Sequence, residues 1–192
     1  MATSRTQPTL PPGPIRLTVD DLRDLPEDGK RYELIDGELH VTPSPAPKHQ
    51  RVSRKLQFLL MVALEQTGQG EVFDAPMDVV LDDATVVQPD LLFLRTEHLH
   101  FIGEKNIQGA PDLVVEILSP STRRHDVLVK SSLYARFGVP SYWIVDPDLD
   151  RIELYRLDGT AYRLATTVQS PAVAEPEEFP GLRLPLLEIF GR

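Results

Sequence analysis

Two acidic side chains stand in segments that are otherwise apolar, where an unpaired charge is costly. Asp90 comes directly before a run of apolar residues, and Glu116 lies within the run Leu113-Val-Val-Glu-Ile-Leu118. Hard cations such as Mg²⁺ are commonly held by one or two carboxylates together with water and substrate phosphate. The two acids therefore predict a cation site. The alternative is that each acid lies at a strand end near solvent, or pairs with an arginine.

A lysine follows these acids on a segment with helical periodicity. Lys130 shares a helix face with Val127 and Tyr134, because the three residues are spaced by three and four positions. From this face its ammonium can point at the acids of the preceding strand, where it would orient water or neutralise a phosphate. The simpler interpretation is a weak ion pair with Asp126, four residues earlier. The helix pattern alone favours the simpler interpretation.

Basic residues gather in two places, although the chain has a net charge of −9. Lys48, Arg51 and Lys55 recur at steps of three and four, so they share one helix face, and the segment 46–57 contains no acid. A second cluster is Arg123-Arg-His125. Such clusters can position a phosphate backbone without reading bases. The alternative is an ordinary helix face in contact with solvent.

Hydrophobic periodicity and turn signals predict the elements that position these residues. Residues 32–41 form a hairpin around Asp36-Gly37, and apolar spacing predicts helices at 49–65 and 123–137. Strands are expected at 72–73, 77–81, 86–94, 112–118, 141–145, 151–157 and 161–168, with a short helix capped by Thr18 and a closing helix at 184–190. Because the two long helices can cover opposite faces of a central sheet, we expect one mixed α/β (α+β) domain.

Length and composition limit the possible functions. The chain has 192 residues and no cysteine, which excludes disulfides, thiolate zinc sites and cysteine nucleophiles. Its acidic balance argues against binding nucleic acid through bulk charge. We expect residues 1–17 to form a flexible proline-rich tail and residues 18–192 to form a single domain. No apolar run approaches the ~18 residues of a membrane span, and the N-terminus has no apolar signal region, so we expect a cytoplasmic protein without membrane contact.

Taken together, the order of motifs resembles the Uma-two family of restriction endonuclease-like proteins. Its marks are Tyr32-Glu-Leu-Ile-Asp-Gly-Glu-Leu39, a proline-rich turn before His49, Gln88-Pro-Asp-Leu91, the segment 109–122, and Gly138-Val-Pro-Ser-Tyr-Trp-Ile-Val-Asp146. The resemblance covers residues 18–190. It implies the core of the PD-(D/E)xK nuclease superfamily, a restriction endonuclease-like mixed β-sheet flanked by helices, here with an N-terminal β-hairpin.

The resemblance also implies roles for individual residues. Asp90 matches the acid of the PD motif and Glu116 the acid of the second motif, so both would hold Mg²⁺ or Mn²⁺. The usual lysine position, two residues after Glu116, is Leu118 here. In similar families the lysine comes from the following helix, where Lys130 stands.

Two acids and one histidine remain to be placed: Glu33, His49 and Asp112. Glu33 and His49 belong to the family pattern and would border the catalytic site, although Glu33 could equally brace the hairpin. Asp112 lies four residues before Glu116, which on a strand corresponds to about 13 Å. We therefore expect Asp112 at the far end of that strand.

These observations predict a metal-dependent endonuclease that hydrolyses phosphodiester bonds, above all in DNA. Lys48, Arg51 and Lys55 would position the nucleic-acid backbone, and a homodimer would reach both strands. The alternative is a non-catalytic module on the same fold that binds nucleic acid or protein, which the net charge of −9 and the displaced lysine favour. A hydrolase for smaller phosphoesters is a third possibility.

Overall fold

The computed structural model describes residues 16–26, 28, 30–42, 44–119 and 125–191, without the side chains of His125 and Asp126. The predicted N-terminal tail lies outside the described residues up to residue 15. The second basic cluster also lies outside them, as does the alternative pairing of Lys130 with Asp126.

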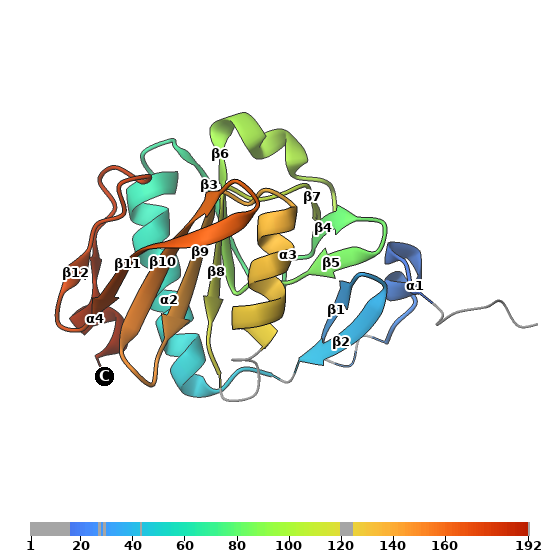
Figure 1. Ribbon diagram of the computed structural model, residues 1–192, viewed down its shortest axis with the longest axis horizontal. Coiled ribbons are helices and arrows are strands. Elements are labelled where there is room, and N and C mark those ends of the chain that lie inside the picture. The colour runs from blue at the N-terminus through green and yellow to red at the C-terminus, as the bar shows by residue number, and fades with distance from the viewer. Residues whose placement is uncertain (1–15, 27, 29, 43, 120–124, 192) are drawn as a thin grey trace, which may run out of the picture.

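A six-stranded mixed sheet forms the centre of the domain (Figure 1). Its strand order is β11-β10-β9-β8-β6-β3, and β8 and β9 are parallel whereas the other neighbours are antiparallel. The strands are β3 (Gly70–Asp74), β6 (Leu91–Arg95), β8 (Leu113–Ile117), β9 (Ser141–Asp146), β10 (Arg151–Asp158) and β11 (Ala161–Gln169). The predicted strands at 112–118, 141–145, 151–157 and 161–168 are thereby confirmed.

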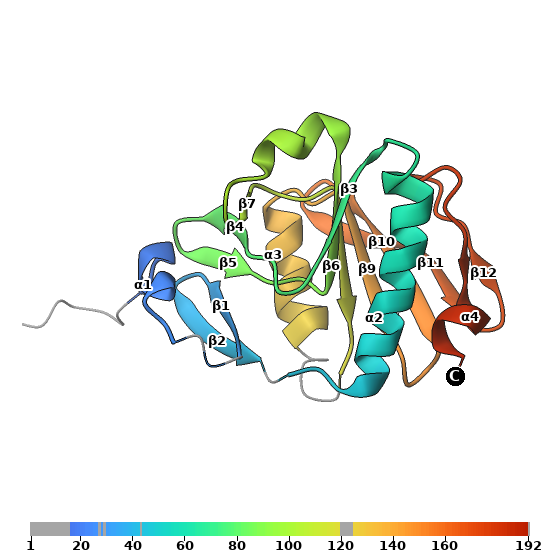
Figure 2. The ribbon, with the colours of Figure 1, turned by 180° about the vertical axis from the view of Figure 1, so that it is seen from behind.

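Two helices cover opposite faces of this sheet, as the sequence predicts. α3 (Ser131–Arg136), preceded by a π-helical segment (His125–Lys130), lies in front of the sheet in Figure 1. α2 (Pro47–Leu60), followed by a π-helical turn (Met61–Glu65), lies in front of it in the reverse view of Figure 2. Its buried residues recur every three or four positions, which gives the buried stripe of an amphipathic helix.

The alternation of side chains along β8 decides which helix Glu116 faces. Leu113 and Val115 belong to the hydrophobic cluster under α2. Val114 and Leu118 belong to the second cluster, which contains residues of α3. Because successive strand residues point to opposite faces, Glu116 points to the α3 side of the sheet.

A smaller five-stranded sheet lies beside the central one on its α3 side (Figure 1). Its order is β2-β1-β5-β4-β7, with β1 (Arg31–Ile35), β2 (Glu38–Thr42), β4 (Val79–Asp82), β5 (Thr85–Val87) and β7 (Ile107–Gln108). The hairpin between β1 and β2 turns at Asp36 (φ 52°) and Gly37 (φ 82°), both left-handed as this tight turn requires. At Gly37 a Cβ atom would also come within 2.8 Å of the Cβ of Arg16.

The predicted single strand at 86–94 is wrong. The structure has two strands there, β5 and β6, which belong to different sheets and are separated by Gln88-Pro-Asp90. Proline lacks the N–H that a ladder needs and so interrupts a strand. The chain crosses from one sheet to the other at this proline, which places Asp90 at their junction.

The remaining elements are short. α1 (Val19–Arg23) begins after Thr18 as predicted, and α4 (Leu186–Phe190) closes the chain after the small pair β12 (Val173–Ala174) and β13 (Leu184–Pro185). A 3-10 helix (Thr96–Phe101) was not predicted. No helix among the described residues has the length and apolar character needed to cross a membrane.

Candidate active site

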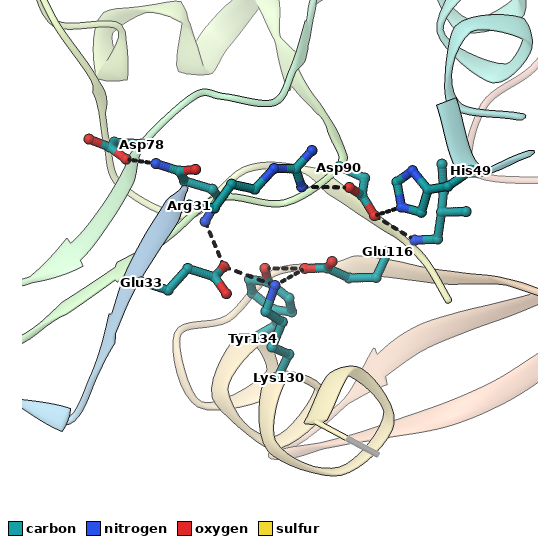
Figure 3. A network of polar contacts seen from close by, with 10 residues as sticks. Arg31, Glu33, His49, Asp78, Asp90, Glu116, Lys130 and Tyr134 are labelled. Carbon is teal, nitrogen blue, oxygen red and sulfur yellow. Dashed lines mark hydrogen bonds and ion pairs between the residues drawn. The ribbon is translucent and has the colours of Figure 1, made fainter. Parts of the chain in front are cut away.

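Lys130 joins two buried carboxylates that come from different sheets. Its Nζ atom lies 2.9 Å from Glu33 Oε1 and 3.0 Å from Glu116 Oε1 (Figure 3). All three residues are buried, with Lys130 only 4% exposed. β1 supplies Glu33, β8 supplies Glu116, and the end of the π-helical segment before α3 supplies Lys130. The lysine therefore points at the acids, and not into solvent.

A phenol completes the hydrogen bonding of Glu116. The hydroxyl of Tyr134, one helical turn after Lys130, donates to Glu116 Oε1 over 2.8 Å. Burial raises the pKa of Tyr134 well above its usual range, and the charges of Glu116 and Glu33 add to this. The phenol consequently stays protonated and acts as a permanent donor to the carboxylate.

Asp90 is held by three donors at the junction of the sheets. Its Oδ1 atom lies 2.9 Å from Arg31 Nη1, and its Oδ2 atom lies 3.0 Å from His49 Nε2 and accepts from the backbone N–H of Ile117 over 2.8 Å. Burial alone would raise the pKa of Asp90. The hydrogen bond and charge of His49, with the Ile117 amide and Arg31, outweigh burial and lower it. The side chain is therefore a carboxylate.

The two predicted acids lie at the same end of the central sheet. Leu91 pairs with Val115 in the antiparallel register of β6 and β8, so the residues just beyond them are Asp90 and Glu116. The bond from the Ile117 amide to Asp90 confirms the proximity, because that amide belongs to the peptide unit after Glu116. Figure 3 shows the Asp90 and Glu116 side chains beside one another, with Lys130 below Glu116.

Three buried carboxylates meet in this cluster. Glu33, Asp90 and Glu116 are each at most 5% exposed. Lys130 and Arg31 bond to these carboxylates and offset part of their charge. Within the described residues, no group of three or more histidine, cysteine, aspartate or glutamate side chains is arranged to hold a metal. The donors thus fit a Mg²⁺-type site with two carboxylates, completed by water and substrate.

A comparison with known families identifies the family of the chain. The profile of the Uma2 family, described as "putative restriction endonuclease", matches residues 19–187. The chain belongs to the Uma2 family. The resemblance identified in the sequence is therefore confirmed.

A solved structure shows that the Uma2 chain shares its fold with a nuclease-like protein. The crystal structure of a "putative nuclease belonging to DUF820" from Anabaena variabilis superposes with a TM-score of 0.76 at 22% identity. The match covers 91% of this chain and 97% of the other. This confirms the nuclease-like mixed α+β fold. No curated protein matches the sequence.

A cavity of about 570 Å³ opens beside Asp90 in the Uma2 chain. It is lined on one side by Arg31 and Asp90, and on the other by residues of α2 that include His49, Arg51 and Arg54. The cavity thus connects Asp90 with a basic face of α2, which is what an anionic substrate approaching Asp90 would need.

The residues of the predicted phosphate-binding face of α2 make different contacts, although Lys48 and Arg51 together line a smaller hollow of about 360 Å³ near the C-terminal segment. Arg51 lines the cavity, whereas Lys48 is exposed and pairs with Asp148 at 3.1 Å. Lys55 donates to the carbonyl oxygens of Glu188 (2.6 Å) and Gly191 (2.5 Å), and so ties α2 to the C-terminal segment. A role for Lys48 and Lys55 in phosphate binding stays a prediction.

Asp112 lies away from this site, as its spacing predicts. It accepts from the backbone N–H of Arg95 (2.8 Å) and contacts His98 Nδ1 (2.9 Å) at the opposite end of β8. His98 and its neighbour His100 belong to the 3-10 helix.

Sequence reasoning missed Arg31 and the contact made by Tyr134. The signal for Arg31 was available, because residues i and i+2 of a strand share a face and Glu33 was already a candidate. An ion pair between Arg136 and Asp36 (2.6 Å) joins α3 to the turn after β1 and so helps to hold the two elements that carry Lys130 and Glu33.

Proposed function

We propose that this protein is a metal-dependent nuclease that hydrolyses phosphodiester bonds, with DNA as its substrate. The observation that carries the proposal is the placement of Lys130 on Glu116, with Asp90 bonded to the next peptide unit. These are the three groups that the family resemblance assigns to catalysis, and they come from three separate elements. Their convergence in a buried cluster supports a common chemical task.

Asp90 and Glu116 are the proposed ligands for Mg²⁺ or Mn²⁺. Their oxygens are the hard donors that such cations prefer, and one or two carboxylates with water and substrate phosphate are enough to hold Mg²⁺. When bound, the cation would supply an acidified water and polarisation of the phosphodiester. His49, Arg31 and the Ile117 amide hold the Asp90 carboxylate in place by the hydrogen bonds described above.

The residues around Glu116 have two proposed roles. Lys130 and Tyr134 both bond to Oε1 of Glu116, which fixes the direction of the carboxylate. A preorganised ammonium beside the reacting phosphate would also stabilise the negative charge that develops in the transition state. Glu33 holds Lys130 from the other side, and its own Oε1 is fixed by the backbone N–H of Gln88 at 2.8 Å.

A polyanionic substrate is supported by the basic lining of the cavity. The chain as a whole is acidic, so attraction must be local. Arg51 and Arg54 line the cavity beside Asp90, where a phosphate would lie next to the carboxylates. We propose nucleic acid as the partner, a homodimer as the assembly that reaches both strands, and the cytoplasm as the location.

One observation favours the non-catalytic alternative. Asp90 already has Arg31 and His49 as partners, and such pairs can serve structure alone. Under this alternative the fold would bind nucleic acid or protein without cleaving it.

A cleavage assay decides between these functions. Supercoiled plasmid, labelled single-stranded DNA, RNA and bis(p-nitrophenyl) phosphate are incubated with Mg²⁺, with Mn²⁺ or with EDTA. We expect metal-dependent cleavage of DNA that Asp90→Asn and Glu116→Gln abolish, while Asp112→Asn, a buried acid at the other end of β8, retains it. Thermal melting checks that each variant is folded. Metal-independent cleavage, or full activity in either active-site variant, would contradict the mechanism, and cleavage of the small diester alone would contradict the substrate.

A further inference from the structure

Arg31 and Asp90 both line the cavity beside α2, and Arg31 is the more exposed of the two. Its Nη1 atom lies 2.9 Å from Asp90 Oδ1, and its side chain is 20% exposed whereas that of Asp90 is 6% exposed. The same arginine lines the cavity that Arg51 and Arg54 also line. Its guanidinium can therefore reach either the carboxylate or an anion in the cavity.

Arg31 also contacts the Asp90 oxygen that a metal ion could bind. Of the three groups that bond to Asp90, it is the one with a permanent positive charge. Two cations that share one carboxylate oxygen compete with each other. A divalent cation on Asp90 would thus weaken the hold of Arg31.

We infer that Arg31 is a displaceable counter-ion, which holds Asp90 in the metal-free protein and contacts the substrate phosphate in the cavity once a divalent cation has bound Asp90. This inference rests on the proposed function. Arginine suits both tasks, since its planar fork of N–H donors matches carboxylate and phosphate alike. When Arg31 moves from Asp90 to the substrate phosphate, metal binding and substrate binding would thus favour each other.

A displaceable counter-ion has opposite effects on the two ligands. Arg31→Gln removes the competitor at Asp90, so the affinity for Mn²⁺ should rise by about fivefold, the effect of a partly buried ion pair. The same change removes a phosphate contact, so DNA affinity should fall and its dependence on salt should become shallower by about one unit. A purely structural arginine would not produce this pair of opposite changes.

Two other arginines serve as matched controls. Arg54 lines the same cavity from α2, so Arg54→Gln should lower DNA affinity without raising Mn²⁺ affinity. Arg163 is exposed on β11, where it faces Asp158 at 3.7 Å, so Arg163→Gln should change neither affinity. Arg31→Met repeats the loss of charge with a different side chain, which guards against an effect peculiar to glutamine.

The experiment measures both affinities on the whole protein. Calorimetric titration with Mn²⁺ gives metal affinity without DNA, and fluorescence anisotropy of a labelled 20-base-pair duplex in Ca²⁺ gives DNA affinity without turnover. Asp90→Asn should weaken Mn²⁺ binding. If it does so while Arg31→Gln and Arg31→Met leave Mn²⁺ affinity unchanged or lower, the counter-ion inference is wrong and the metal site stands. If wild type and Asp90→Asn bind Mn²⁺ equally, the metal site itself is wrong.

Discussion

The ammonium of Lys130 lies 3.0 Å from Glu116 Oε1, although the two residues belong to different elements. Leu118, two residues after Glu116, is buried on the same face of β8 and packs in the cluster that contains residues of α3. The amine is thus delivered by the helix that covers this face, and the strand position is left to apolar packing. Although the lysine is not two residues after Glu116 in the sequence, a lysine still contacts Glu116 in the folded protein.

Removal of the Lys130 charge should destabilise the fold strongly. Lys130→Met leaves Glu33 and Glu116 buried without their shared cation, and breaking a buried pair in this way typically costs about 3–5 kcal/mol. Urea denaturation measures the loss. Lys48→Met is the matched control, because its exposed pair with Asp148 should contribute at most about 1 kcal/mol. Equal losses in the two variants would contradict the buried network.

Loss of the Tyr134 hydroxyl should lower both stability and cleavage. Tyr134→Phe removes one donor from the buried Glu116 carboxylate, which we expect to cost about 1–3 kcal/mol and to slow metal-dependent cleavage. Tyr162→Phe removes a comparable hydroxyl. That hydroxyl donates to the Val139 carbonyl over 2.8 Å, and not to Glu33, Asp90 or Glu116. That control should lose stability and keep its cleavage rate. If both variants lose cleavage in proportion to stability, Tyr134 has no special role in positioning Glu116.

Part of the site could be predicted because its signals are local. Glu116 was identified as an acid inside an apolar strand, and α2 was identified by apolar residues at helical spacing. Asp112 was excluded by the geometry of a strand alone. These inferences need only neighbours along the chain.

The rest depends on contacts between distant segments. Leu34 of β1 pairs with Val86 of β5, and only this pairing brings Arg31 to Asp90. The sequence did not indicate that the chain crosses between sheets at Gln88-Pro-Asp90, because apolar residues that are typical of a strand continue on both sides of this segment. The hydrogen bonds of Lys55 could not be predicted, because their acceptors lie in the C-terminal segment, more than 130 residues away.

Lys55 should stabilise the C-terminal segment and make no contribution to DNA binding. Lys55→Met removes the donors to the Glu188 and Gly191 carbonyls, so amide hydrogens of α4 should exchange faster, while the duplex affinity stays unchanged. Arg51→Gln, on the same helix but in the cavity, should show the reverse pattern. Weaker DNA binding by Lys55→Met with unchanged exchange in α4 would instead support the phosphate contact predicted from sequence.

Alkaline pH should destabilise the protein through three tyrosines, of which Tyr134 is buried and Tyr155 and Tyr162 are partly buried. Burial raises the pKa of Tyr134 and of Tyr162, and burial together with Glu153 raises the pKa of Tyr155 to about 12. In the unfolded chain these phenols ionise near pH 10, so above that pH the unfolded state holds fewer protons than the folded state. The free energy of unfolding must then fall as pH rises, by up to about 1.4 kcal/mol per pH unit for each fully protected tyrosine.

Urea denaturation between pH 9 and pH 11.5 tests this dependence. Stability should be unaffected by these groups below pH 9 and should decline above pH 10. Tyr162→Phe removes one of the protected phenols, so its decline should be shallower than that of the wild type. Tyr32→Phe serves as a comparison: desolvation and the bond to Asp28 raise the pKa of Tyr32 as well, but its phenol is far less buried than that of Tyr162, so the change in slope should be smaller. Parallel declines in wild type and Tyr162→Phe would show that the buried phenol does not stay protonated.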